Sequence, residues 1–408
     1  MTNKWKTDKW FVSPWNYNEE IISQYNFPEK IQIHDTTLRD GEQQVGTVFN
    51  YDDKIRIAEK LAELGVHRIE AGMPAVSPQD EKAIRDLAKR DLGNTEIYAF
   101  ARCIVDDIKR AADCGVKGVV VEIPSSIHLI EHAYQWPLEK AVELSIKATN
   151  CAKENGLNTV FFTIDASRAE MGWLVKLIKQ VSTEGHMDAL TLVDTMGVLT
   201  PDAVKYFVTE IKRNFKGVTL ETHFHNDFSM AVINTITALS LGAEVAHTTL
   251  LGLGDRAGGA ALEDVVVALL TMYGVDMGIK TEKLYEAAKL VEELSNHKLP
   301  MNKSIVGDNM YKIESGIPAA WFRKLKEDQI TDLYPLRWDL MGQTSPEIVL
   351  GKGSGEPSIM AHLEKLDIKV PEDKIRDVLL QVKEKAIENK KLLTEDDFKE
   401  ILNKMGFM

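Results

Sequence analysis

The 408-residue chain is poor in cysteine, in aromatic side chains and in net positive charge. Its three cysteines, Cys103, Cys114 and Cys151, are an odd number without a close pair. This argues against a disulfide framework or a cysteine metal knuckle and favours a reducing cytoplasm. A formal net charge of -13 argues against non-specific binding to nucleic acid or to an anionic membrane, because both need a basic surface. No run approaches the roughly 20 apolar residues of a membrane span. We therefore expect a cytoplasmic protein that acts on small molecules.

Short β-rich runs alternate with longer amphipathic helical patterns over residues 30–275. The eight runs are Ile31 to Asp35, Val66 to Ala71, Glu96 to Ala101, Lys117 to Glu122, Asn158 to Phe162, Ala189 to Val193, Thr219 to His223 and Glu244 to Thr249. Strict alternation predicts a parallel sheet with right-handed crossovers, and eight units predict closure into a (β/α)8 TIM barrel, which uses about 250 residues.

Two of the intervening helices carry clear end signals. Asp53 to Leu64 has an apolar face and is followed by Gly65, which predicts the helix end. Pro201 to Arg213 is preceded by Thr200, a predicted N-cap, and has proline at its first helical position.

A doubly wound open sheet is the alternative fold. Such a sheet gathers its ligand-binding residues at one switch point, whereas a barrel gathers them at the carboxyl ends of all its strands. Here, polar residues stand at or just after the ends of six runs: Arg39 and Asp40, Glu70, Arg102, Glu122, Asp194, and His223. This distribution favours the barrel.

The chain outside the barrel divides into three further segments. Residues 1–29 form an arm that carries Trp5, Trp10, Phe11, Trp15 and Tyr17, and we expect this arm to pack on another surface, such as a second subunit of a homodimer. Residues 276–355 read as a helical extension, Glu282 to Leu294, and an irregular linker. Residues 356–408 read as a small helical subdomain that includes Asp373 to Glu388 and Glu395 to Lys404.

Two histidines at the end of the seventh run suggest a metal site. His223 and His225 are two residues apart, so strand alternation puts both rings on one face. A pair at this spacing can also be structural or incidental. In a closed barrel the seventh strand is only one strand away from the first, which leads to Asp40, so the carboxylate and both imidazoles can share one divalent ion. Asn226 and Asp227 either support these ligands or cap a helix.

Other polar residues near the strand ends have two interpretations each. Arg39 either pairs with Glu70 or Glu122 or stabilises negative charge on a substrate oxygen. Thr195 either holds a carboxylate through its hydroxyl or belongs to a capped turn. The glycine-rich stretch 252–259 lacks the spacing of a phosphate loop. It is either a close-approach loop lining the site or a plain turn, with Arg256 binding an anionic substrate or pairing with Glu263.

Four ordered motifs carry a family resemblance. They are His34-Asp-Thr-Thr-Leu-Arg-Asp-Gly-Glu-Gln43, Val193-Asp-Thr-Met-Gly-Val-Leu-Thr-Pro201, His223-Phe-His-Asn-Asp227 and Gly254-Asp-Arg-Ala-Gly258. With the linker segments at 300–309 and 348–355, they resemble the DRE-TIM metallolyase superfamily. The closest resemblance is to its branch of isopropylmalate, homocitrate and citramalate synthases. The resemblance runs from about residue 30 to Ile368.

The resemblance implies a reaction and a set of roles. Such enzymes condense the methyl carbon of acetyl-CoA with a 2-oxo acid and hydrolyse the thioester. The resemblance implies that the metal ligands are Asp40, His223 and His225, that Arg39 supports the enolate or keto oxygen, and that Gln43, Glu70 and Thr195 face the substrate. We assign Arg39 and Glu70 as catalytic. We also assign substrate binding to Arg102 and Arg256. The ligand set suits Mg, Mn, Zn, Co or Fe(II) alike.

Three departures from the synthase pattern concern possible acid–base or ligand positions. Gly259 stands where the synthases carry an asparagine, Ile164 where they carry a glutamate, and Pro318 where they show a histidine. A proline side chain transfers no proton. Either another group, with Asp165 and His128 as our choices ahead of Tyr311 and His186, supplies the base, or the chain catalyses a related step.

Two alternative functions remain beside the synthase. An acyl-CoA lyase or retro-aldolase would use the same enolate chemistry in the cleavage direction. Against the lyase, Asp255 and Arg256 stand where hydroxymethylglutaryl-CoA lyases show a cysteine. A barrel that binds a metabolite without catalysis is the third possibility.

Overall fold

The computed structural model describes residues 4–408, which group into two compact units. One unit comprises residues 15–299, and the other combines residues 4–14 with residues 300–408. The boundaries expected at residues 29, 275 and 355 therefore fall inside these units. Cys103, Cys114 and Cys151 are buried free thiols. Across the described residues, no helix combines the length and the apolar character needed to cross a membrane.

Eight parallel strands of the first unit close into a barrel in chain order, from β1 to β8 and back to β1. They are β1 Gln32–Asp35, β2 Arg68–Glu70, β3 Glu96–Arg102, β4 Gly118–Pro124, β5 Asn158–Ile164, β6 Ala189–Asp194, β7 Thr219–Phe224 and β8 Val245–Thr248. Each matches a predicted run to within two residues at either end. The predicted (β/α)8 TIM barrel is confirmed, and the open-sheet alternative is excluded.

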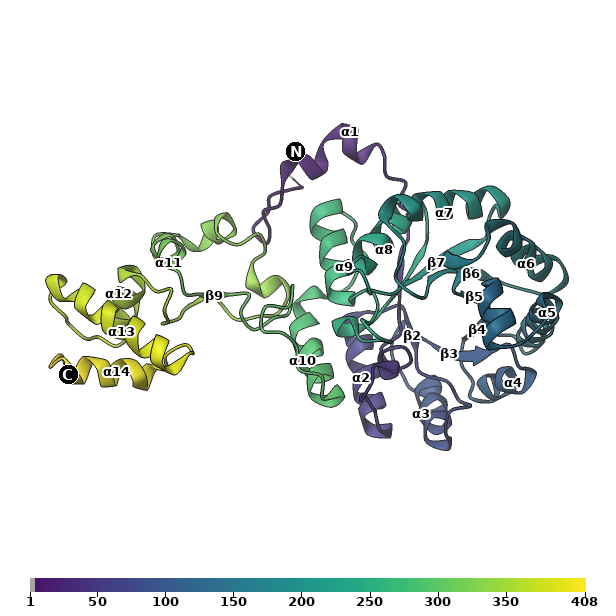
Figure 1. The fold of residues 1–408 in the computed structure, drawn as a ribbon, viewed down its shortest axis with the longest axis horizontal. Helices are drawn as coiled ribbons and strands as arrows, with labels where there is room; N and C mark the ends of the chain where they lie inside the picture. The colour runs from purple at the N-terminus through teal and green to yellow at the C-terminus, as the bar shows by residue number, and fades with distance from the viewer. Residues whose placement is uncertain (1–3) are drawn as a thin grey trace. The chain divides into compact units, whose positions relative to one another are not determined.

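Helices surround the strands on the outside of the barrel (Figure 1). The α-helices of this unit are α1 Glu19–Ile22, α2 Tyr51–Leu64, α3 Pro78–Lys89, α4 Val105–Asp113, α5 Leu138–Glu154, α6 Met171–Glu184, α7 Pro201–Asn214, α8 Ala231–Ser240, α9 Leu262–Ala268 and α10 Leu284–Ser295. Both end signals hold. Gly65 ends α2 in the left-handed conformation with φ of 88°, and the Thr200 hydroxyl caps α7 by accepting from the Ala203 amide.

Closure of the barrel sets the geometry of the site. Strand β8 pairs with β1 on one side and with β7 on the other, so β1 and β7 are separated by one strand. Asp40 follows β1 and opens a short 3-10 helix, Gly41–Gln43, while His223 lies on β7 and His225 directly follows it. The carboxyl ends of the two strands therefore present their side chains at the same mouth.

The second unit is a short linker region followed by helices. It contains β9 Lys312–Ile313, β10 Glu347–Ile348, α11 Gly316–Phe322, α12 Glu356–Lys365, α13 Ile375–Asn389 and α14 Glu395–Lys404. The last two helices match the predicted segments closely. Their apolar faces build a core with α12 that includes Ile359, Val378, Val382, Phe398 and Leu402.

The beginning of the aromatic arm belongs to this second unit and packs against its residues 335–339. The Phe11 amide donates to the Pro335 carbonyl at 2.9 Å, and the Arg337 amide donates to the Lys9 carbonyl at 2.7 Å. Lys9 also pairs with Asp339. These contacts give part of the arm a partner within its own chain, and the homodimer stays a prediction.

Candidate active site

Three side chains from two strand ends converge at the mouth of the barrel. His223 and His225 place their Nε2 atoms 3.1 Å apart, and Oδ1 of Asp40 lies 3.9 Å from the first and 3.8 Å from the second. All three side chains are at least 94% buried. The predicted metal-ligand set is thus brought together in space.

The three atoms fit a divalent ion in size. The two Nε2 atoms and Oδ1 of Asp40 form a triangle with sides of 3.1, 3.9 and 3.8 Å. An ion at its centre would lie about 2.1 Å from each atom, and Zn usually lies 2.0–2.2 Å from an imidazole nitrogen or a carboxylate oxygen. The second oxygen of Asp40, Oδ2, is buried and has no hydrogen-bond partner among the described residues. An unpaired buried carboxylate oxygen is costly unless a cation compensates it.

The glycine-rich stretch 252–259 lies close against this carboxylate. A Cβ on Gly254 would come within 2.5 Å of Asp40 Oδ2, and one on Gly259 would lie 3.9 Å from it. Gly254 therefore allows the backbone to approach the carboxylate. This supports the close-approach interpretation of the stretch rather than that of a plain turn.

Arg39 is fixed beside the three predicted ligands. Its Nη1 donates to Asp40 Oδ1 at 2.9 Å and to Gln43 Oε1 at 3.0 Å, and its Nε pairs with Glu70. The guanidinium lies 4.2 Å from the ring centroid of Phe100. Its Nη2 is buried and unpartnered within residues 4–408. Arg39 thus pairs with Glu70, as one interpretation had it, and still keeps a free donor for a substrate oxygen, as the other requires.

The charges around Arg39 follow from these contacts. Burial alone would raise the pKa of Glu70, but the charge of Arg39 and the hydrogen bond from His34 outweigh burial and bring this pKa to about 2. Burial lowers the pKa of His223 well below its ordinary value, and the charge of Arg39 lowers it further. His223 is therefore neutral, the state in which imidazole binds metal.

A cavity of about 160 Å³ opens over these groups. Its walls include Arg39, Asp40, Gln43, Phe100, Glu122, Phe162, Ile164, Val193, Thr195, His223, His225 and Asp255. A second cavity of about 290 Å³ shares Arg39, Gln43, Phe100 and Glu122 with the first and is also lined by Met73, Val76 and Arg102. Of the residues predicted to bind or face the substrate, Gln43 lines both cavities, Thr195 lines the first and Arg102 lines the second. Glu70 is fully buried and lines neither, because it lies behind Arg39.

Arg256 lies behind the histidines. Its guanidinium donates to both oxygens of Asp227, at 2.8 and 2.9 Å, and its Nη2 lies 3.2 Å from Nδ1 of His225. It does not pair with Glu263, which accepts from the Leu251 amide instead. Arg256 thus holds the ring edge of His225 that is turned away from the other two ligand atoms. The Asn226 side chain accepts from the Ala231 amide at the start of α8.

Asp165 and His128, the two preferred candidates for the base, lie together but line neither cavity. Asp165 has a φ of 62°, and its carboxylate accepts from Ser126 at 2.6 Å and from Arg168 at 2.7 and 3.0 Å. His128 Nε2 lies 3.0 Å from the same carboxylate. A carboxylate with this many donors is already satisfied, which gives Asp165 a structural explanation.

Sequence reasoning assigned Glu122 only as a possible partner of Arg39. The structure places it in the wall of both cavities, at the carboxyl end of β4. The signal in the sequence was a single carboxylate that ends the apolar run Val119-Val-Val121.

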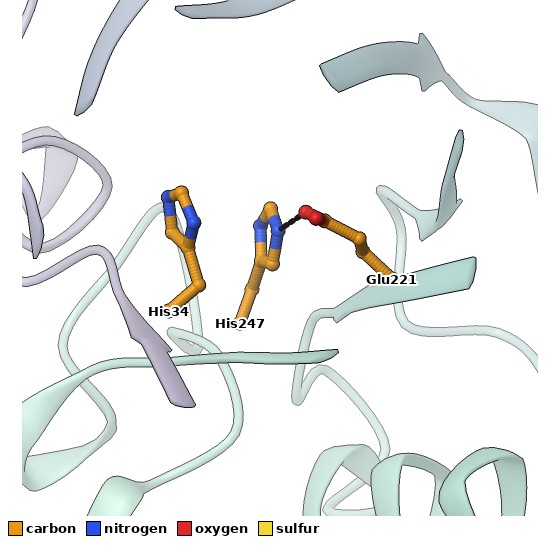
Figure 2. Close-up of side chains that lie close together, drawn as sticks. All are labelled: His34, Glu221 and His247. Atoms are coloured by element: carbon orange, nitrogen blue, oxygen red, sulfur yellow. Dashed lines mark hydrogen bonds and ion pairs between the residues drawn. The ribbon is translucent and has the colours of Figure 1, made fainter. Parts of the chain in front are cut away.

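A second cluster of two histidines and a carboxylate lies in the interior of the barrel. His34, Glu221 and His247 come from β1, β7 and β8, and all are buried. The His34 and His247 rings stand side by side, with centroids 4.4 Å apart and planes inclined by 15°, and Glu221 reaches His247 from the other side (Figure 2). Sequence reasoning missed this cluster, because its members lie in three separate strands without a shared motif.

Partners already satisfy most of this second cluster. Glu221 accepts from Arg68 and from His247, each at 2.7 Å, and His34 Nε2 lies 3.2 Å from Glu70. Each imidazole faces its carboxylate through Nε2, so Nε2 carries the proton in the neutral ring and has no lone pair for a metal. This second cluster therefore holds Glu70 in place through His34, and Glu70 in turn holds Arg39.

Comparison with known proteins identifies the family of the chain. The HMGL-like family model matches residues 30–291. The chain is 37% identical over 394 residues to homocitrate synthase AksA of Methanothermobacter thermautotrophicus, covering 97% of each chain. It is 40% identical over 369 residues to a putative (R)-citramalate synthase of Archaeoglobus fulgidus, covering 90% of this chain and 74% of the relative.

Solved structures share the fold. The Bacillus subtilis HMG-CoA lyase superposes with a TM-score of 0.60 at 24% identity, over 67% of this chain and 96% of the lyase. At this identity the likeness concerns the barrel alone. On the family match and the extent of the sequence identity, the chain belongs to the HMGL-like family of TIM-barrel proteins.

Proposed function

We propose that the chain catalyses a divalent-metal-dependent condensation of acetyl-CoA with a 2-oxo acid, followed by hydrolysis of the thioester. One observation carries the proposal: Asp40, His223 and His225 meet at a common point beside a free Arg39 donor. The relatives named as homocitrate and citramalate synthases, at 37% and 40% identity over most of the chain, give this site its reaction class.

The side chains divide the work between binding and charge stabilisation. Asp40, His223 and His225 would hold the ion, which when bound polarises the carbonyl of the 2-oxo acid. Arg39 Nη2 donates to an oxygen that gains negative charge, and such a fixed donor typically contributes 10²–10³-fold to the rate. Glu70 and the Phe100 ring keep the guanidinium in place. Gln43 and Thr195 hydrogen-bond the carboxylate of the acid from the cavity wall.

The cavity sizes suit two small reactants. A volume of 160 Å³ equals about five water molecules at roughly 30 Å³ each, enough for a short oxo acid. The adjoining 290 Å³ receives the acyl group or the side chain of the acid. The metal is Mg, Mn, Zn, Co or Fe(II), all of which accept this donor set. We also propose a cytoplasmic location and a homodimer.

The test is release of free thiol from acetyl-CoA. Purified protein is mixed with each of the five metals in turn and with a panel of 2-oxo acids of increasing side-chain length. We expect thiol release with at least one acid, its loss on chelation, and its recovery when metal is added back. Arg39→Ala should reduce the rate by about 10²–10³-fold while metal content stays unchanged.

Two results would contradict the proposal. If no combination of 2-oxo acid and metal leads to thiol release, the proposed synthase activity is wrong. Formation of acetyl-CoA from a hydroxylated acyl-CoA, without condensation, would instead assign the cleavage direction.

A further inference from the structure

The two cavities meet at a single carboxylate that no other side chain holds. Asp40, Asp255 and Glu122 line the first cavity, and Glu42, Asp80 and Glu122 line the second, so only Glu122 belongs to both. The other four already have partners: Asp40 pairs with Arg39, Asp255 with Arg256, and Glu42 and Asp80 both pair with Lys54. Within residues 4–408, no hydrogen bond or ion pair holds the Glu122 side chain.

The strand register explains where Glu122 points. On β4 it lies opposite Arg102 of β3 and opposite Phe162 of β5. Ile164, two residues beyond Phe162, has the same orientation and lines the first cavity. Glu122 and Ile164 are therefore neighbours on the inner face of adjacent strands. The Glu122 carboxylate therefore lies on the strand next to Ile164, the position where the family resemblance predicted a glutamate.

The environment of Glu122 gives it the acidity of a general base near neutral pH. Burial raises its pKa to about 7, although the charges of Arg39 and Arg102 oppose the shift. A proton-transferring group works best when its pKa lies near the operating pH. The titratable or charged groups that interact with it are Arg39, Glu70, Arg102, Cys103, Asp107 and Tyr134.

We infer that Glu122 is the general base that removes the proton from the methyl carbon of acetyl-CoA, an inference that rests on the proposed function. The C–H electron pair becomes the enolate, and its carbon bonds to the carbonyl carbon of the 2-oxo acid. The carbonyl π pair moves to the oxygen, which then takes the proton back from Glu122. One hydrogen has moved from carbon to oxygen, and the carboxylate is regenerated.

The experiment measures two reactions in the same three proteins: wild type, Glu122→Gln and Asp106→Asn. The first is thiol release with acetyl-CoA, metal and the 2-oxo acid panel. The second is loss of deuterium from methyl-deuterated acetyl-CoA into water, followed by mass spectrometry in the presence of metal. Asp106 is an exposed carboxylate at the start of α4 and serves as the matched control. Metal content and melting temperature are recorded for every variant.

We expect Glu122→Gln to lose both rates by at least about 100-fold, in kcat more than in KM, with metal content and melting temperature unchanged. Glu122→Asp should retain part of the rate, and the acidic limb of the pH–rate profile should be absent from the residual activity of Glu122→Gln. Asp106→Asn should match the wild type. Restoration of activity to an inactive Glu122→Ile by a second change, Ile164→Glu, would support the inference further.

The outcomes separate the inference from the proposed function. If Glu122→Gln keeps either rate within about threefold of wild type, the inference is wrong and the synthase stands. If the wild type releases no thiol but exchanges deuterium, and Glu122→Gln exchanges none, Glu122 is still the base and the proposed condensation is wrong. A wild type that does neither overturns both.

Discussion

Two clusters of two histidines and a carboxylate lie within one barrel, and they differ in what surrounds them. In the first, Asp40, His223 and His225, the two Nε2 atoms face each other at 3.1 Å, and one oxygen of Asp40 is unpaired. In the second, Glu221 is paired twice and the imidazoles are stacked. The first lines a cavity, whereas the second does not contribute to that cavity.

The difference lies in the direction of the lone pairs. A ring nitrogen binds a metal only along its own ring plane, and the nearly parallel rings of His34 and His247 cannot aim at one ion between them. The rings of His223 and His225 are inclined by 55°, so their planes cross. Both clusters combine two imidazoles with a carboxylate, but only in the first do two Nε2 atoms and a carboxylate oxygen surround a common position that borders a cavity. We interpret the first as a metal site and the second as a buried support.

The largest expected effect separates the clusters by metal content. His225→Ala removes one of three ligands and should weaken metal binding by more than about 100-fold, since changes outside the ligand shell alone cost 10 to 100-fold. His247→Gln keeps a donor toward Glu221 and should bind metal like the wild type. Metal content after dialysis, measured by mass spectrometry, distinguishes the two. Equal metal loss in both variants would make the second cluster part of the site.

The second prediction concerns stability, to which the second cluster should contribute more than an exposed ion pair does. Arg68→Met leaves the ionised Glu221 buried with one partner fewer and should lower the free energy of unfolding by about 3–5 kcal/mol. Arg213→Met, which breaks an exposed pair with Glu210, should cost at most about 0.5 kcal/mol. Denaturant unfolding measures both. A loss of less than about 1 kcal/mol in Arg68→Met would mean that the pair is not structural.

The third prediction is a loss of stability at acid pH that arises in the second cluster. Burial lowers the pKa of His34 to about 4 from 6.5, with a further contribution from His247. The charge of Arg39 lowers the pKa of Glu70 to about 2, although burial acts in the opposite direction. The hydrogen bond from His247 likewise lowers the pKa of Glu221 to about 2 against the effect of burial. All three groups bind protons more weakly in the folded than in the unfolded chain. Stability is therefore complete above pH 6.5 and falls as the pH drops toward 4, and then further between 4.5 and 2.

Melting temperatures of metal-free protein across this range give the measurement. In His34→Gln, whose amide can still donate to Glu70, the change between pH 6.5 and 4 should be smaller than in the wild type. A melting temperature that rises as the pH falls through this window would have the wrong sign for the assigned pKa shifts.

The smallest expected effect concerns Gly259, which has no side chain and lies beside the first cluster. A Cβ on Gly259 would make ordinary contacts at 3.7–3.9 Å with Phe224 O and Asp40 Oδ2, so a side chain fits there. Gly259→Asn should add a polar contact and tighten metal binding several-fold, which isothermal titration would measure. The same substitution at Gly254 would collide with Asp40 and should weaken binding. Weaker binding in Gly259→Asn would show that the position does not face the ion.

Much of this protein is determined by local sequence pattern. The alternation of β-rich runs and helical patterns predicted all eight strands, because the period of each element is set by its own backbone geometry. Thr200 and Pro201 fixed the start of α7 in the same local way. The two-residue spacing of His223 and His225 put both rings on one face, since successive side chains of a strand alternate. The eight-strand pattern, interpreted as a closed barrel, then indicated Asp40 as their partner, and the family motifs agreed.

Only the tertiary structure decided which distant groups meet. Barrel closure brought Asp40 within 4 Å of both histidines, joined His34 to His247 across neighbouring strands, and placed Glu122 rather than Asp165 in the cavity wall. A strand pattern specifies the face on which a side chain lies, but not which side chains of other strands oppose it. That depends on register and closure, and the contacts of Asp165 with Ser126 and Arg168 exist only once the chain has folded.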